Sequence, residues 1–264
     1  MDLGLTGKIA IVAASSKGLG RATAATLAAE GALVTINGRD REVLARTRQE
    51  IADASGTDVL AIHGDMANPT AIAHLVAETV RVRGALDILV CNAGGPPAGT
   101  FDSFPEDQPW LDAVNLTLMS TLRLIRTALP HLKQSRTGSI TTIVSTSVKQ
   151  PIPHLILSNT IRTGVIGLTK SLSLELGSQN IRVNNVCPGT TLTDRDTTVG
   201  AKRANQEGVS LETILARDAA EIPMGRLGTP EEFGRVVAFI ASPAASYVSG
   251  VTLQVDGGNT RGLF

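Results

Sequence analysis

The chain has 264 residues, 42% hydrophobic and 18% charged, which is ordinary for a soluble globular protein with a well-buried core. Its 24 acidic and 24 basic residues give a formal net charge of zero, so nothing in its electrostatics favours nucleic acid or an anionic membrane as the main partner. The N-terminus, MDLGLTGKIAIV, lacks the basic region of a signal peptide and no apolar stretch is long enough to span a bilayer, so we expect a cytoplasmic protein.

Seven short apolar runs alternate with segments of helical pattern along the chain. Such runs are typical of parallel strands covered on both faces, and the alternation predicts right-handed crossovers. We predict an α/β fold with one Rossmann-type doubly wound parallel sheet of about seven strands, helices on both faces, and a single domain over residues 1–264. The predicted strands are 9–13, 32–36, 58–62, 86–91, 140–144, 183–187 and 251–255, and the predicted helices are 18–31, 40–54, one beginning near 69, 106–132 and 156–176.

The interval 190–223 interrupts this alternation. It is long and polar, and it contains the run DRDTT and a helix of mixed charge. Long insertions after the carboxyl end of a strand often close over a binding site. We predict a substrate lid within the domain; a surface loop without that role is the alternative.

The two cysteines, Cys91 and Cys187, lie at the ends of predicted buried strands. Free thiols in a reducing cytoplasm account for such cysteines better than a disulfide or a metal ligand pair does. We predict no metal site.

A glycine-containing turn follows the first predicted strand, with the sequence Ala13-Ala14-Ser15-Ser16-Lys17-Gly18-Leu19-Gly20. Glycine allows such a turn to close tightly and the backbone to approach a pyrophosphate. Gly20 opens a helix whose N-terminal dipole favours phosphate. Ala14 fits the turn only if its φ angle is negative. The motif alone is not specific for a dinucleotide.

Other segments at fixed places resemble the motifs of the short-chain dehydrogenase/reductase family, including its 3-oxoacyl-ACP reductase-like members, and the resemblance covers essentially the whole chain. They are Gly64-Asp65-Met66, Asn92-Ala93-Gly94, Asn115, Pro188-Gly189 with Thr193-Asp194, and Val255-Asp256-Gly257-Gly258. The resemblance implies that a nicotinamide dinucleotide is bound by Ala14, Ser16, Lys17, Gly18, Leu19, Gly20, Arg39, Asp65, Met66, Asn92, Ala93, Gly94, Arg162, Pro188, Gly189 and Thr193.

The family's catalytic motif, a Ser followed thirteen residues later by Tyr-x-x-x-Lys, is altered in this chain. The Ser is Ser145, but Ser158 stands at the Tyr position and Arg162 at the Lys position. The run 163–170, TGVIGLTK, is similar to the family's next helix and fixes this alignment without a gap. The single Tyr of the chain, Tyr247, lies near the last strand and is no substitute.

The resemblance implies a catalytic set of Ser145, Ser158, Arg162 and Asn115, with Asn115 holding a structural water in the proton path. A serine hydroxyl is a far weaker acid than a phenol of pKa about 10. Arginine keeps the positive charge but cannot release its proton at physiological pH. His154 and Lys149, on the loop before Ser158, are alternative proton donors; each is also explained as an ordinary loop residue.

The second predicted strand ends Asn37-Gly38-Arg39-Asp40, with no acid at its tip to bind the free ribose hydroxyls of NAD. Lys17 and Arg39 can grip a 2′-phosphate, while Asp40 is better explained as a helix cap. We predict NADP, with NAD as the alternative.

Three functions remain open: an NADP-dependent carbonyl reductase or alcohol dehydrogenase with an altered proton route, a non-redox enzyme such as a cyclase, dehydratase or lyase, and a catalytically silent nucleotide-binding protein. We expect a small-molecule substrate, a carbonyl or alcohol, and neither nucleic acid nor membrane as a partner. The resemblance also implies a homotetramer or homodimer that pairs through helices 106–132 and 156–176.

Overall fold

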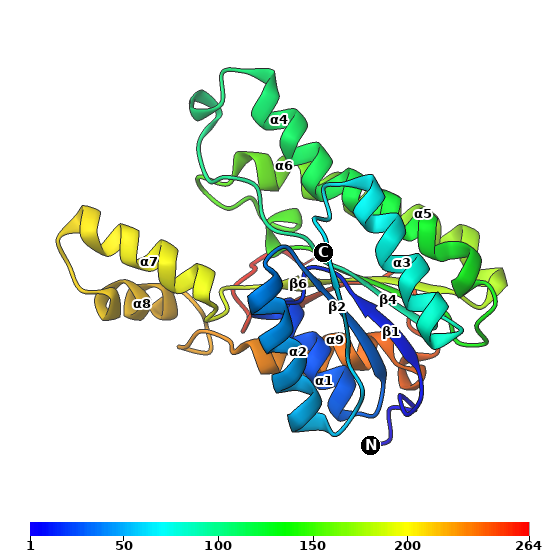
Figure 1. Ribbon diagram of the computed structural model, residues 1–264. Coiled ribbons are helices and arrows are strands. Elements are labelled where there is room, and N and C mark those ends of the chain that lie inside the picture. The colour runs from blue at the N-terminus through cyan, green and yellow to red at the C-terminus, as the bar shows by residue number, and fades with distance from the viewer. Residues whose placement is uncertain (264) are drawn as a thin grey trace.

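Within residues 1–263, which a computed structural model describes apart from the side chains of Arg195 and Lys202, seven strands form one parallel sheet. Their order is β3-β2-β1-β4-β5-β6-β7, and every neighbouring pair is parallel (Figure 1). The predicted doubly wound sheet is confirmed. The strands are β1 (Ile9–Val12), β2 (Leu33–Gly38), β3 (Leu60–His63), β4 (Ile88–Cys91), β5 (Ser139–Ile143), β6 (Arg182–Pro188) and β7 (Thr252–Val255).

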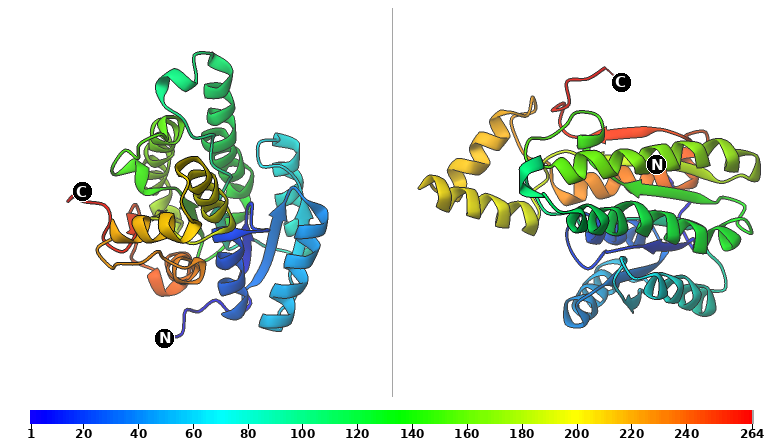
Figure 2. Two further views of the ribbon diagram at one scale, coloured as in Figure 1. Left: turned by 90° about the vertical axis from the view of Figure 1, so that its left-hand side faces the viewer. Right: turned by 90° about the horizontal axis from the view of Figure 1, so that it is seen from above.

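Helices cover both faces of the sheet because its central strands are apolar on both sides. The helices are α1 (Gly18–Ala29), α2 (Arg41–Ser55), α3 (Pro69–Arg83), α4 (Asp107–Ala113), α5 (Ser120–Leu132), α6 (Ile156–Leu176), α7 (Asp194–Glu207), α8 (Leu211–Ala220) and α9 (Pro230–Ala241). In β1, Ala10 and Val12 pack with α1, α2 and α9, whereas Ile9 and Ile11 pack with α3, α5 and α6. Figure 2 shows these two helical layers from further directions.

The segment predicted as one helix over 106–132 has three parts. A π-helical stretch, Val114–Met119, separates α4 from α5, and α5 continues to Leu132. The apolar pattern of the sequence predicts a helix but does not reveal a π turn, because only the hydrogen-bond register changes.

Helix α9 is absent from the elements predicted above. Its start carries a capping box, in which the Thr229 side chain accepts from the backbone N–H of Glu232 while the Glu232 side chain accepts from that of Thr229. Pro230 occupies the first turn. These signals are readable in the sequence TPEE and could have identified the helix.

The interval after β6 folds into two helices, α7 and α8, which project from one side of the body (Figures 1 and 2). The sequence predicted one helix of mixed charge there, and the structure adds a second after Gly208, whose φ of +67° ends α7. Over the part of the chain that the structure describes, no helix combines the length and apolar character that a membrane span requires.

Candidate active site

One cleft of about 830 Å³ lies along the edge of the sheet at which the strands end. It spans the point between β1 and β4 where the strand order reverses, the usual ligand site of open α/β sheets. Each strand contributes residues at or just past its carboxyl end, and the seven sets come from distant parts of the sequence. They include Ala14, Gly38, Gly64, Asn92, Ser145, Gly189 and Asn259, for β1 to β7 in turn.

The start of α1 forms one wall of this cleft. Lys17 is the N-cap residue, but its side chain caps no N–H group, and the first turn carries no acidic residue. A Cβ atom on Gly20 would lie 2.6 Å from the Ala14 carbonyl oxygen, so only glycine permits this close turn. The turn therefore offers backbone N–H groups and a helix dipole to a phosphate group.

Ala14 has a φ angle of +45°, so the expectation of a negative φ is wrong. The turn requires the left-handed region here, which costs a non-glycine residue about 1–2 kcal/mol. Two amide side chains hold the strained unit: the Ala14 N–H donates to Asn37 Oδ1 (3.3 Å), and the Ala14 carbonyl accepts from Asn92 Nδ2 (3.0 Å).

Asn37 is a cleft residue that the sequence analysis missed. Its Nδ2 donates to the carbonyl oxygens of Ile62 (2.9 Å) and Gly64 (3.1 Å), at the end of β3. Asn37 therefore connects the glycine-containing turn over residues 13–20, called the nucleotide turn below, to β2 and β3. An asparagine inside an otherwise apolar strand was the available signal, because a buried amide requires partners.

Two cations lie at the tip of β2. Lys17 and Arg39 both line the cleft, and Arg39 is an exposed side chain 3.9 Å from Asp65. Asp40 caps α2, because its Oδ1 accepts from the N–H groups of Glu42 and Val43, at 3.0 Å each. The bond from Val43 lowers the pKa of Asp40, and the charge of Lys17 contributes to the same shift. The carboxylate of Asp40 thus serves as the N-cap of α2.

Ser145, Ser158 and Arg162 line the same cleft. Arg162 Nε donates to Ser158 Oγ (3.0 Å), and Nη1 donates to the Val144 carbonyl at the end of β5 (2.8 Å). Ser145 Oγ accepts from the Ser147 N–H (3.1 Å). Because both serine oxygens already accept, their hydroxyl hydrogens can be donated to a ligand oxygen.

Asn115 lies outside the residues that line the cleft. Its Nδ2 donates to the Ala67 carbonyl (3.2 Å), and its Oδ1 accepts from Arg123 Nη1 (2.6 Å). The side chain thus connects α5 to the loop after β3. The other predicted catalytic and cofactor residues all lie at the cleft.

The alternative proton donors do not reach the cleft in this structure. His154 is exposed, with a φ of +59°, and neither it nor Lys149 is a lining residue. Tyr247 is fully exposed. Cys187 is buried behind Ser145, and burial raises the pKa of its thiol to about 11. No His, Cys or Tyr lines the cleft among the residues that the structure describes.

Several polar lining residues are absent from the site predicted from the sequence. Asn259 and Thr260 follow β7, Gln150 belongs to the loop before α6, and Glu221 follows α8. Only the fold brings these segments together. These four residues add two amides, a hydroxyl and a carboxylate to a cleft that apolar residues such as Ile152 and Leu155 also line.

Comparisons with known proteins agree with this geometry. The family model described as enoyl-(acyl carrier protein) reductase matches residues 13–260. A glucose 1-dehydrogenase of Gluconobacter oxydans (strain 621H) is 34% identical over 259 residues, covering 96% of this chain and 92% of that protein. A putative ketoacyl reductase of Streptomyces coelicolor is 34% identical over 253 residues, covering 95% and 96%.

Solved structures are similar over the whole chain. The L-sorbose reductase from Gluconobacter frateurii, complexed with NADPH and L-sorbose, superposes with a TM-score of 0.96 at 30% identity and covers 100% of both chains. An actinorhodin polyketide ketoreductase variant with NADPH gives a TM-score of 0.91 at 33% identity, covering 97% of this chain and 98% of that one.

Proposed function

Because this chain belongs to the short-chain dehydrogenase/reductase family of oxidoreductases, we propose that it is an NADP-dependent carbonyl reductase or alcohol dehydrogenase with an atypical proton-transfer site. One observation carries the proposal. The hydroxyls of Ser145 and Ser158 and the guanidinium of Arg162 line the cleft that also holds the nucleotide turn. A carbonyl group can therefore lie beside both a cofactor and hydrogen-bond donors.

The cofactor in this proposal is NADP. Both solved neighbours named above were determined with NADPH. The residues of this chain fit the group, because Gly20 leaves no room for a side chain in the turn and Lys17 and Arg39 supply positive charge at the tip of β2. When bound, NADPH supplies the hydride.

Ser158 and Arg162 take the places of the family's Tyr and Lys in our alignment, and their contacts suggest how they act. Ser145 and Ser158 donate hydrogen bonds to the substrate's carbonyl oxygen, and Arg162 stabilises the negative charge that develops there. Arg162 also orients the Ser158 hydroxyl through its Nε. The proton that completes the alcohol comes from solvent through a serine hydroxyl, since arginine does not release one.

The α7–α8 hairpin serves as the substrate lid in this proposal, within a single domain. Thr193, Asp194 and Asp196 at the start of α7 line the cleft, as does Glu221 after α8. The hairpin thus contributes to the wall of the cleft, and Thr193 lies beside Gly18 of the nucleotide turn. Residues on it are the ones that would select the substrate, a small carbonyl compound or alcohol.

We further propose that the protein is a homotetramer or homodimer. Leu111 on α4 and Leu174 on α6 are large apolar side chains that are exposed in the isolated chain. Both lie on the helical segments expected to pair, so a partner copy would cover them. Light scattering at micromolar concentration checks this, and a monomer would refute it.

Incubation of the protein with NADPH and a panel of aldehydes and ketones tests the proposed activity directly. We expect NADPH oxidation matched by the mass of an alcohol product. Tight NADPH binding without oxidation across the panel would instead favour a non-redox enzyme or a silent nucleotide-binding protein on the same fold.

A further inference from the structure

A second cavity, of about 190 Å³, adjoins the cleft beneath the α7–α8 hairpin. The two share four lining residues, Thr190, Asp196, Glu221 and Asn259, so the second is a side chamber of the first. Its volume is far above the ~10–15 Å³ that one water molecule requires, so several heavy atoms of a ligand fit.

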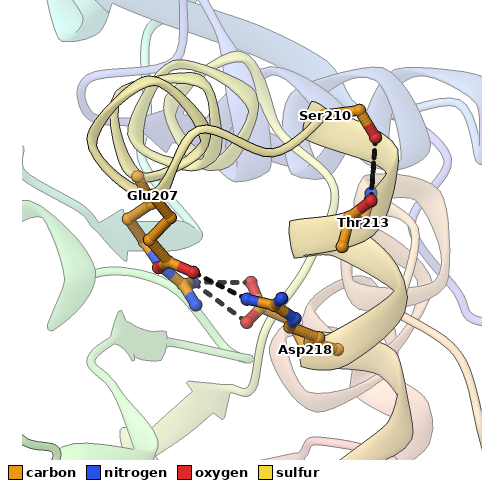
Figure 3. A network of polar contacts seen from close by, with 6 residues as sticks. Glu207, Ser210, Thr213 and Asp218 are labelled. Carbon is orange, nitrogen blue, oxygen red and sulfur yellow. Dashed lines mark hydrogen bonds and ion pairs between the residues drawn. The ribbon is translucent and has the colours of Figure 1, made fainter.

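Two ion pairs join the helices of the hairpin, which supply most of the residues that line the chamber. Arg203 on α7 binds both carboxylate oxygens of Asp218 on α8 at 2.9 Å, and Arg217 on α8 lies 2.6 Å from Glu207 on α7. The Ser210 side chain caps α8 beside them, and Figure 3 shows how Glu207 and Asp218 approach the same space between the helices. The chamber thus lies against two helices that are connected to each other at two points.

The polar groups of the chamber favour hydroxyl groups over anions. Arg203 and Asp218 neutralise each other, and Asp196 accepts a hydrogen bond from the Thr193 side chain. Glu221 is exposed at the junction with the cleft and leaves an excess of negative charge there. A substrate carboxylate or phosphate would be repelled, whereas a hydroxyl could donate to Glu221.

The chamber also has an apolar side, formed by Val199, Leu215 and Leu227. A chain of carbons that carries hydroxyls presents both kinds of surface, C–H groups and O–H groups. An unbranched acyl chain would satisfy only the apolar side and would offer Glu221 no hydrogen-bond donor.

We propose that this side chamber is a subsite for the hydroxyl-bearing end of the substrate, so that the protein acts on small, neutral polyhydroxylated ketones. The inference rests on the proposed reductase function and narrows it. The ketone carbon lies near Ser145 and Ser158, and the remaining hydroxylated carbons extend toward Glu221 and Asn259.

Three six-carbon probes test the subsite with NADPH: a ketohexose, 2-hexanone, and the anionic 5-oxohexanoate. We expect the ketohexose to have the highest kcat/KM and 5-oxohexanoate the lowest. In Glu221→Leu the kcat/KM ratio of ketohexose to 2-hexanone should fall about tenfold, the range of one charge-assisted hydrogen bond. Glu212→Leu, an exposed carboxylate on α8 away from both cavities, is the matched control and should leave the ratio unchanged.

Val199→Phe gives an independent variant, since Val199 is exposed on α7 and can be enlarged without disturbing a core. It should reduce the same ratio by filling the chamber. An unchanged ratio in both variants, or a wild type that prefers 2-hexanone, would overturn the subsite while leaving carbonyl reduction intact.

Thermal shift of the NADPH-loaded protein separates this inference from the proposed function. A ketohexose-dependent rise in Tm that is lost in Glu221→Leu, without NADPH oxidation, would support the subsite and contradict the reductase. Absence of any ketohexose effect on both Tm and NADPH oxidation would overturn the subsite.

Discussion

The two halves of the cleft differ in what determines them. The nucleotide half, formed by the ends of β1 to β3, depends on backbone geometry: a left-handed Ala14, a Gly20 with no room for a side chain, and Asn37 joining three strands. The reaction half, formed by the ends of β5 to β7 and the α7–α8 hairpin, depends on which side chains stand at a few positions.

The difference bears on which half of the cleft can change its side chains without a change of fold. Gly20 in the turn has no room for a side chain, because its Cβ would lie 2.6 Å from the Ala14 carbonyl oxygen. Ser158 and Arg162, in contrast, fit on a regular helix in hydrogen-bonding contact with each other. Chemistry can change there without any change of fold.

The largest effect should come from the backbone of the nucleotide half. In Gly20→Val the new Cβ would lie 2.6 Å from the Ala14 carbonyl and 2.8 Å from Asn92 Nδ2. Relieving such overpacking costs about 1–3 kcal/mol, so NADPH should bind about 10- to 100-fold more weakly by calorimetry. Gly177→Val is the control, because nothing lies within 4 Å of its Cβ. Equal affinity in Gly20→Val would contradict this account of the turn.

A side chain of the nucleotide half should have a smaller effect. Arg39→Asp removes a cation from the tip of β2 and places a carboxylate there, so the preference for NADPH over NADH should fall by more than about tenfold. Arg46→Asp on α2 changes the same charge away from the cleft and should leave the preference intact. If the wild type binds both cofactors equally, the assignment of Lys17 and Arg39 fails.

The strain at Ala14 predicts a modest change in stability. Ala14→Gly removes the ~1–2 kcal/mol cost of the left-handed conformation but loses ~0.4–1 kcal/mol through the freer unfolded chain. The free energy of unfolding in urea should therefore rise by between about 0 and about 1.6 kcal/mol. Ala13→Gly, in a fully buried position, should lower it. A clear loss of stability in Ala14→Gly would show that the left-handed conformation of Ala14 carries no such strain.

The reaction half should show almost no pH dependence. The described lining residues include no His, Cys or Tyr, so kcat should vary less than about threefold between roughly pH 6 and 9. A sigmoidal kcat profile near neutrality would reveal an unrecognised acid.

The buried thiol of Cys187 affects stability at higher pH. Burial raises the pKa of Cys187 from 9.0 to about 11, so the thiol of the folded protein stays neutral between roughly pH 6 and 9. The stability gained by keeping the thiol neutral is complete below pH 9.0 and is lost as the pH rises toward about 11.

The sequence predicted the fold well where the apolar periodicity agrees with the positions of helix caps and turn residues. The strands alternate with helices, and α6 begins at Ile156 and ends at Leu176 as predicted. The π-helical stretch that begins at Val114 could not be predicted from the sequence, because the apolar pattern there is that of an ordinary helix. Helix α9 was readable from its capping box and was overlooked.

The site was predictable where the residues belong to local motifs. Gly18, Gly20 and the run after β4 lie at the cleft because they adjoin strand ends. Glu221 was not predictable, since two helices separate it from the nearest motif and only the tertiary fold places it there, whereas Asn259 directly follows the motif that ends at Gly258 and was overlooked. The φ of Ala14 was misjudged because alanine seldom adopts the left-handed region, and here two asparagine side chains stabilise it.

The double variant Ser158→Tyr with Arg162→Lys tests most directly whether the cleft is built for carbonyl reduction. The new phenol would enter space that Ser158 now borders, and the new lysine would lower its pKa toward the working range. General acid catalysis is worth roughly 10²–10⁴ in rate, so NADPH-dependent reduction of simple ketones should rise at least about tenfold, and much less in either single variant. Normal NADPH binding with no gain in the double variant would contradict the account.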